Sequence, residues 1–186
     1  MASYNYAIQN YETEKMARVV GRSLPVSTKQ AIEISNRIRK KTLVRAKKIL
    51  ENVVAMKEAI PHKRFLDGVG HIPGIGPGRY PVKTCKAVLK LLDSVEANAQ
   101  NKALNVNSLY ICHIAAQKAS KQWHYGRQRR RQMKRTNLEI VVREMPDKES
   151  KERKAKQKAG KTEKSESKAL EEKQKLEAHQ TKEAKK

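Results

Sequence analysis

Apolar side chains recur at helical spacing in three stretches of the first half of the chain. Ser27 suits an N-cap, with Gln30 as its capping-box partner, and the apolar steps that follow predict a helix over 28–39. A second apolar stripe predicts a helix over 42–57, and the most regular stripe predicts a third over 81–103. These segments favour one apolar face each, so we expect them to share a core.

Other segments alternate with a period of two. A short strand is predicted over 17–24, although Gly21 interrupts it. Further strands are predicted over 108–116 and 138–143. In the first of these two, the face of Leu109 and Ile111 alternates with that of Tyr110, Cys112 and Ile114. The simplest geometry is an antiparallel pair joined by a long hairpin or loop over 117–137.

The segment 58–80 has no clear period and is punctuated by glycine and proline. We expect an irregular connection, which is long for a compact domain and is therefore a candidate for a functional role. The run from Gly74 to Arg79 is similar to a phosphate loop, but it lacks the Gly-Lys-Ser/Thr ending and follows no predicted strand. Two interpretations remain open: a backbone that approaches an RNA phosphate, or an ordinary flexible connector.

Charge separates this chain from ordinary cytosolic enzymes. Its 186 residues include 42 Lys and Arg against 19 Asp and Glu, a formal net charge of +23. Such an imbalance indicates a polyanionic partner, nucleic acid first and an anionic membrane surface second. No apolar run approaches the ~18 residues of a membrane span, and the N-terminus lacks a secretory pattern. We expect a soluble intracellular protein with no membrane partner.

The C-terminal segment 147–186 differs in composition from the rest. It is dominated by Lys, Glu and Ala and cannot bury enough apolar surface to offset its ordering entropy. We expect a Lys/Glu-rich tail, disordered or a solvated helix, after a folded domain over 1–146. The folded part keeps most of the positive charge, so the tail is an addition to a domain that is already basic.

A one-sided charge pattern lies inside the expected domain. From Ala97 to Leu138 there is no acidic residue, and basic residues cluster in the predicted hairpin. Arginine and lysine neutralise phosphates, the aromatic side chains of Trp123, His124 and Tyr125 can stack on unpaired bases, and Gly126 allows a turn. This combination suits irregular RNA better than a DNA duplex. The competing interpretation is a solvated basic loop.

Residues that could perform catalysis are sparse. The five histidines and two cysteines show no zinc-ligand spacing, and no carboxylate pair stands in a plausible pocket sequence. Cys85 falls on the apolar stripe of the third helix and is expected in the core. We therefore predict no enzymatic activity, no cofactor, no metal site and no small-molecule substrate.

Several motifs together resemble a known family. They are Gly68-Val69-Gly70-His71, Gly78-Arg79-Tyr80-Pro81, His113-Ile114-Ala115-Ala116, Tyr125-Gly126-Arg127 and Leu138-Glu139-Ile140-Val141-Val142. In order and spacing, residues 10–145 resemble the universal large-subunit ribosomal protein numbered twenty-two in bacteria and archaea and seventeen in eukaryotes. The glycine-rich insert before Arg79 is similar to the archaeal and eukaryotic branch.

The resemblance implies an α+β domain with a three-stranded antiparallel sheet, three helices and a long protruding hairpin at about 114–137. It implies a structural role in the large ribosomal subunit in the cytoplasm, in contact with rRNA and neighbouring ribosomal proteins. The hairpin tip of such proteins lines the exit tunnel and meets the nascent polypeptide. By position, the tip comprises His124, Tyr125, Gly126 and Arg127, between limbs over 114–124 and 128–137.

From the resemblance and the basic pattern together, we expect rRNA contacts at a set of mostly cationic side chains. They are Arg18, Arg22, Lys29, Lys40, Lys41, Lys63, Arg64, His71, Arg79, Tyr80, Lys83, Lys118, Lys121, Trp123, Arg129, Arg130, Arg131, Lys134 and Arg135.

The hairpin also departs from the family pattern. The limb before Gly126 is several residues shorter than usual, and Arg129, Arg130 and Arg131 replace small and polar residues. Two other functions stay open: a chromatin-type or other nucleic-acid-binding protein, and an RNA-modifying enzyme. The first leaves the hairpin unexplained, and the second needs a cofactor loop or an acid–base pair that the sequence does not show.

Overall fold

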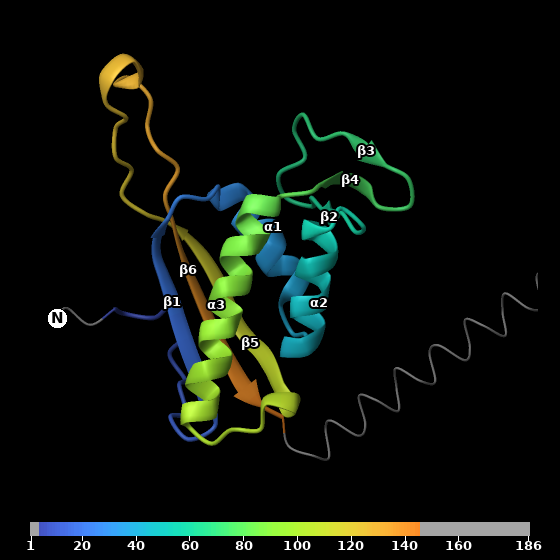
Figure 1. Ribbon diagram of the computed structural model, residues 1–186, viewed down its shortest axis with the longest axis vertical. Coiled ribbons are helices and arrows are strands. Elements are labelled where there is room, and N and C mark those ends of the chain that lie inside the picture. Colours follow the sequence, from blue (N-terminus) through green and yellow to red (C-terminus); the bar gives the residue numbers. More distant parts are fainter. Residues whose placement is uncertain (1–3, 146–186) are drawn as a thin grey trace, which may run out of the picture. The chain divides into compact units, whose positions relative to one another are not determined.

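The computed structural model describes residues 4–145 and combines helices with antiparallel strands (Figure 1). The helices are α1 (Thr28–Ile38), α2 (Leu43–Val54) and α3 (Val82–Asn101). The strands are β1 (Met16–Leu24), β2 (Ile60–Pro61), β3 (His71–Ile72), β4 (Gly76–Arg79), β5 (Leu109–Lys118) and β6 (Thr136–Glu144). The α+β class, the three helices and the three longer strands are confirmed. The predicted tail over 147–186 lies outside the described residues.

The main sheet has the order β1-β6-β5, with both pairings antiparallel. Strand β6 therefore lies in the centre, although it is the last strand of residues 4–145. Helix α3 packs against β1 and α1 against β5, so the helices cover one face of the sheet. The part of the chain described up to Glu144 forms one compact unit around this core.

The core joins the apolar stripes of the helices to alternate residues of the sheet. Leu50 of α2, Leu92 of α3 and Ile140 of β6 are fully buried members of one cluster. Cys85 also belongs to it, as its place on the helical stripe predicts, and burial raises the pKa of its thiol to about 12. A protonated thiol without solvent access is a poor nucleophile, so Cys85 serves packing.

A β-bulge corrects the alternation expected for the strand over 108–116. Ile111 lies opposite Val142 and His113 lies opposite Val141, which leaves Cys112 without a partner residue. The extra residue shifts the phase of the side chains. Ile111 and Ile114 are consequently both buried in the helix-facing core, whereas simple alternation places them on opposite faces.

The connection over 58–80 is less irregular than predicted. Its short strands β2, β4 and β3 pair antiparallel into a second sheet beside the ends of α1 and α2 (Figure 1). Two- and four-residue strands rich in glycine and proline carry no periodic signal, so the sequence pattern misses them. Gly78 fits here because a Cβ would lie 3.0 Å from Ile72 Cδ1.

A buried carboxylate anchors the loop that follows β2. Glu33 of α1 is 1% exposed. It accepts backbone N–H bonds from Lys63 (3.2 Å), Arg64 (2.8 Å) and Phe65 (2.9 Å). Burial by itself raises the pKa of this carboxyl group, but the three donors outweigh burial and hold it below 4.5. A residue on a helical face thus fixes a loop about thirty positions away.

The expected capping box at the start of α1 is wrong in its details. Ser27 occupies the N-cap position, but its side chain accepts no capping hydrogen bond. Gln30 turns away as well, because its Oε1 accepts a 3.1 Å hydrogen bond from the Thr84 hydroxyl of α3. A tertiary partner has replaced the local one, and the first turn also lacks an acidic residue.

The second face of the main sheet is partly covered by the segment before β1. Glu139 of β6 is fully buried there. It accepts a 2.6 Å hydrogen bond from the Tyr4 hydroxyl and a 2.9 Å bond from the backbone N–H of Ala7. His113 Nε2 lies 3.8 Å from the same carboxylate. The two hydrogen bonds satisfy the buried carboxylate and tie the N-terminal segment to the sheet.

We predict that Tyr4→Phe lowers the free energy of unfolding by about 1.5 kcal/mol, the value typical of a partly buried hydrogen bond to a charged group. Burial, followed by the bond to Glu139, raises the pKa of Tyr4 from 10 to about 12. The stabilisation is therefore complete below pH 10 and declines as the pH rises from 10 to 12. Urea unfolding of both proteins between pH 7 and 11 tests this. Tyr125→Phe, at an exposed position, is the control, and a pH-independent difference contradicts the assignment.

We predict a larger loss of unfolding free energy, about 2–3 kcal/mol, for Glu33→Gln, because an amide cannot accept all three backbone bonds with its NH₂ group in place of one oxygen. The native pKa is lowered, so the stabilisation is present above pH 4.5 and is lost as the pH falls through the lower, native pKa. The measured quantity is the difference in free energy of unfolding between pH 7 and 3. Glu51→Gln, on the exposed side of α2, should change little. An equal loss in both variants excludes the proposed anchor.

Candidate nucleic-acid interface

The segment between β5 and β6 extends away from the body of the domain (Figure 1). The regular ladder ends at the pair Lys118 and Thr136. Beyond it, the two limbs are joined by bonds such as Met133 N–H to Gln122 O (2.7 Å) and His124 N–H to Arg131 O (2.9 Å). We call residues 119–135 the basic arm. Its limbs are less regular than β-strands because few ladder bonds hold them.

The end of the basic arm is a short 3₁₀ turn over Gly126–Gln128. Gly126 has a φ of +62°, in the left-handed region that glycine adopts readily. An ideal Cβ at this position would meet no atom within 4 Å, so the backbone angle and not crowding within the chain favours glycine. The closing bond runs from Arg129 N–H to Gly126 O at 3.2 Å.

The side chains of the basic arm face solvent. Trp123 is 60% exposed and Tyr125 is 87% exposed. Exposure of such large aromatic surfaces to water is unfavourable. The three consecutive arginines, Arg129 to Arg131, are also exposed. His124 and Arg135 are half-buried, and Arg135 is held by a 2.9 Å bond from Nη1 to Ser23 O of β1. The arm therefore offers cations and aromatic surfaces with few internal partners.

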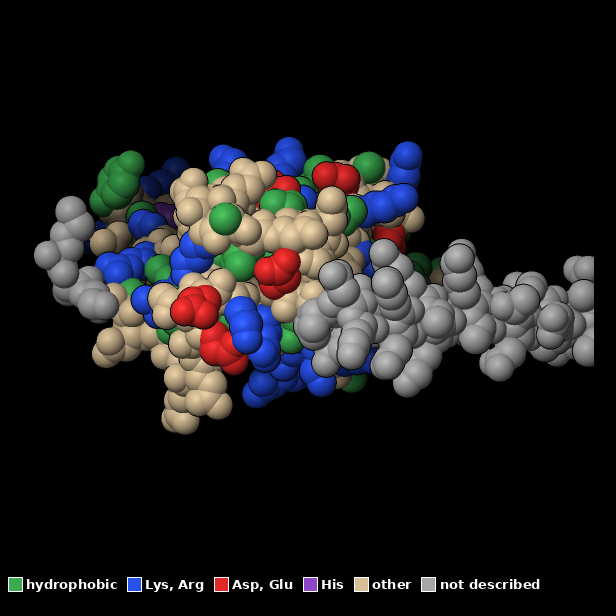
Figure 2. Space-filling model, turned by 90° about the horizontal axis from the view of Figure 1, so that it is seen from below, with side chains coloured by type: hydrophobic (Ala, Val, Ile, Leu, Met, Phe, Trp, Pro, Cys, Tyr) green, Lys and Arg blue, Asp and Glu red, His purple; other side chains and the backbone are tan. Residues whose placement is uncertain are grey.

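Several acidic residues of the domain are buried or paired with cations outside the arm. Glu33 and Glu139 are buried, Glu58 pairs with Arg37, and Lys47 pairs with both Asp93 and Glu96. Figure 2 views the end of the domain opposite the arm, where Asp and Glu side chains lie among Lys and Arg. The arm itself contains no acidic residue, so its positive charge is not offset within its own segment.

Other predicted contact residues lie on separate surfaces. Arg18 and Arg22 are exposed on β1, where tyrosines pack on them: the Arg18 guanidinium is 4.6 Å from the Tyr6 ring centroid and 4.4 Å from that of Tyr11. These rings occupy part of the surface that RNA would need. Lys40 and Lys41 lie in the turn before α2, and burial, followed by Arg37 and Arg45, lowers the pKa of Lys41.

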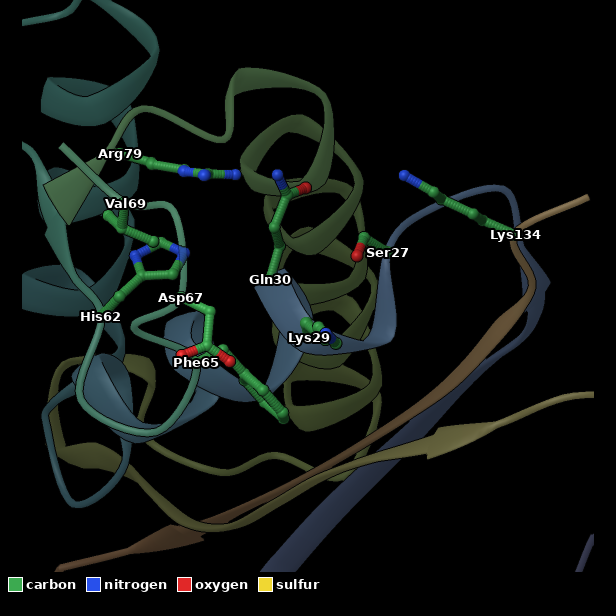
Figure 3. Close-up of a pocket in the computed structure, with 9 residues that line it drawn as sticks. All are labelled: Ser27, Lys29, Gln30, His62, Phe65, Asp67, Val69, Arg79 and Lys134. Carbon is green, nitrogen blue, oxygen red and sulfur yellow. The ribbon is translucent and has the colours of Figure 1, made fainter. Parts of the chain in front are cut away.

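The remaining predicted residues surround the small sheet and the start of α1. Lys29, Lys63, Arg64, His71, Arg79, Tyr80 and Lys83 are all exposed, as are Lys118 at the end of β5 and Lys121 in the arm. Although distant in sequence, Lys29, Arg79 and Lys134 line one hollow, which Figure 3 shows with its other lining residues. The sequence pattern identified these three cations but not their proximity.

Sequence reasoning missed several residues of this surface. Phe65 and Asp67 line the hollow, and Gln30 faces it instead of capping α1. Phe65 is the single phenylalanine of the chain and follows Lys63 and Arg64, a combination of aromatic and basic residues that was available as a signal. In residues 4–145 no cluster of three metal-ligating side chains occurs, and no helix there is long and apolar enough to cross a membrane.

Comparison with known proteins identifies the family of this domain. Residues 19–143 match the family described as Ribosomal protein L22p/L17e. The chain is 44% identical over 144 residues to the large ribosomal subunit protein uL22 of Thermoplasma volcanium, a match that covers 75% of this chain and 96% of the relative. The protein of the same name from Archaeoglobus fulgidus is 42% identical over 150 residues, covering 76% and 97%. These two relatives match over almost their whole length, and the chain therefore belongs to the Ribosomal protein L22p/L17e family.

Proposed function

We propose that this chain is a structural, non-enzymatic protein of the large ribosomal subunit that binds rRNA mainly through the basic arm. Membership in the family and the names of its relatives support the ribosomal role, which places the chain in the cytoplasm. The observation that carries the rRNA-binding part is the arm itself. It extends away from the core, carries exposed arginines and contains no acidic residue.

The chemistry of the arm suits irregular RNA. Exposed Arg and Lys side chains neutralise phosphates and release counterions, which contributes most of the affinity for nucleic acid. Exposed Trp123 and Tyr125 offer planar faces on which unpaired bases stack. A single thin arm with both features fits between RNA helices, whereas a major-groove reader of DNA usually inserts a longer helix or a regular β-ribbon. The only helix in the arm is one 3₁₀ turn.

The end of the arm is the proposed exit-tunnel contact. His124, Tyr125, Gly126 and Arg127 form the part of the arm around the 3₁₀ turn. In this proposal Tyr125 and Arg127 face rRNA on one side and the nascent polypeptide on the other, and the globular part contacts neighbouring ribosomal proteins. Gly126 supports the tight turn that keeps the tip narrow, because its φ of +62° is unfavourable for a residue with a Cβ.

The globular surface supplies secondary contacts in this proposal. The exposed cations around α1 and the small sheet are available, whereas Arg18 and Arg22 must first separate from the tyrosines that pack on them. Arg135 is engaged with Ser23 O and therefore acts mainly to hold the base of the arm. Because the cations of β1 are covered by tyrosines, we rank the arm and the cations around α1 and the small sheet above them as rRNA contacts.

We predict that replacing Arg129, Arg130 and Arg131 by Ala reduces the dependence of rRNA affinity on salt. Three lost phosphate contacts should decrease the slope of log affinity against log salt by about 2–3. The slope is measured by filter binding of the full chain to transcribed archaeal large-subunit rRNA, with duplex DNA as a competitor. The control replaces Lys48, Lys86 and Lys90, which are exposed on helices α2 and α3. If the arginine variant changes the slope no more than the control, the arm does not bind phosphates.

We predict that a photo-crosslinker at residue 125 or 127, in assembled subunits, reaches both rRNA and a stalled nascent peptide. The same group at residue 48 should never reach the peptide. Gly126→Val should leave the domain folded, because no neighbour lies within 4 Å, but should strain the turn by about 1–2 kcal/mol and impair late subunit maturation. Crosslinks to rRNA without any to the peptide would place the tip outside the tunnel, while leaving rRNA binding intact.

A further inference from the structure

A hollow of about 230 Å³ lies between the start of α1, the loop after β2, strand β4 and the base of the basic arm (Figure 3). Its lining residues are Ser27, Lys29, Gln30, His62, Phe65, Asp67, Val69, Arg79 and Lys134. It is formed by three parts of the chain that are far apart in the sequence: the start of α1, residues 62–79 and the arm.

The hollow brings three cations and one carboxylate, that of Asp67, together. Lys29, Arg79 and Lys134 come from α1, β4 and the arm, and none of them is in an ion pair with a carboxylate of residues 4–145. Arg79 donates one bond, from Nη2 to Gly68 O at 2.6 Å, which orients the guanidinium and leaves further N–H groups to bind a ligand. Figure 3 shows Arg79 and Lys134 extending from opposite sides toward Gln30. Cations converging in this way favour a bound phosphate group.

The wall of the hollow also offers an aromatic face. Phe65 is half-buried, with Lys29 Nζ 5.5 Å and Arg64 Cζ 5.6 Å from its ring centroid. The three backbone bonds to Glu33 hold the segment 63–65 against α1, so the ring is attached to a fixed backbone. A base that stacks on this ring displaces one of these two side chains from it and keeps its phosphate within reach of both.

The polar groups of the hollow suit a nucleotide better than a bare inorganic anion. Thr84 donates to Gln30 Oε1, which leaves the Gln30 NH₂ group as a donor at the hollow. Asp67 is an acceptor that would repel a simple anion but can accept from a ribose 2′-hydroxyl or an exocyclic amine. His62, 5% exposed, has Nδ1 3.1 Å from Ile60 O and also lines the hollow.

We propose that this hollow binds one unstacked nucleotide of rRNA, with the phosphate between Lys29, Arg79 and Lys134 and the base against Phe65. The proposal rests on the rRNA-binding function proposed above and adds a specific pocket to it. A charged surface alone binds any RNA backbone, whereas a pocket with an aromatic wall and paired donors and acceptors selects a base that leaves its stack. Binding of this one nucleotide fixes the position of the domain on rRNA at the base of the arm.

The first test identifies the RNA that enters the hollow. A benzophenone amino acid replaces Phe65 in the full chain, which is bound to transcribed Thermoplasma volcanium large-subunit rRNA and irradiated. The expected result is crosslinking at a single unpaired nucleotide, mapped by primer extension. The same group at residue 44, which is exposed on α2, should not label that nucleotide. Crosslinks from residue 65 spread over many nucleotides would overturn the proposal.

The second test separates stacking from charge. Phe65→Leu should weaken rRNA binding by roughly 5- to 150-fold, the range for loss of one stacked base, with an unchanged salt slope. Lys134→Gln should decrease that slope by about one, and Lys48→Gln is the matched control. Because Lys134 is exposed, its substitution should leave the fold intact even if Phe65→Leu is unstable.

The results also distinguish this proposal from the function on which it rests. If Phe65→Leu and Lys134→Gln bind as the wild type while the Arg129–Arg131 variant loses salt dependence, the hollow is not a nucleotide pocket and the arm still binds rRNA. If all three variants bind as the wild type, neither the hollow nor the arm binds rRNA as proposed.

Discussion

Central placement of β6 is the constraint on which the rest of the structure depends. This strand pairs with β1 on one side and β5 on the other, and five consecutive residues from Leu138 to Val142 are buried. Ile140 and Val142 contribute to the helix-facing core, while Glu139 on the other face receives Tyr4 and Ala7. A strand buried on both faces fixes its register strongly, because a slip by one residue would exchange the carboxylate with the apolar side chains.

The basic arm depends on that fixed register. It continues from the β5–β6 pair, so the direction of the ladder sets the direction in which the arm leaves the domain (Figure 1). Like charges and exposed aromatic rings give the arm little internal stabilisation, and the sheet supplies its rigid base. The bond from Arg135 to Ser23 O reinforces this base by tying the arm to β1. A stable domain can thereby present a segment whose own sequence favours binding over folding.

Two buried carboxylates hold segments without regular structure in place. Glu33 and Glu139 are two of the few carboxylates in a strongly basic domain, and both satisfy backbone N–H groups of segments without regular structure. One anchors the loop after β2 and the other anchors the N-terminal segment. The burial of these two carboxylates holds the irregular segments in place. It also leaves the outer surface with an excess of cations.

The sequence by itself determined the three helices, the three longer strands and the basic arm, because each has a strong local signal: apolar periodicity or a one-sided charge run. It also singled out Lys29, Arg79 and Lys134 as cations of interest. Only the tertiary structure decided that these three share a hollow with Phe65, that Gln30 bonds Thr84 and not the α1 backbone, and that a bulge at Cys112 buries Ile114. The first two features arise from contacts between segments tens of residues apart, for which a linear pattern carries no signal. The third arises because a single extra residue in a strand reverses the faces to which all later side chains of that strand point.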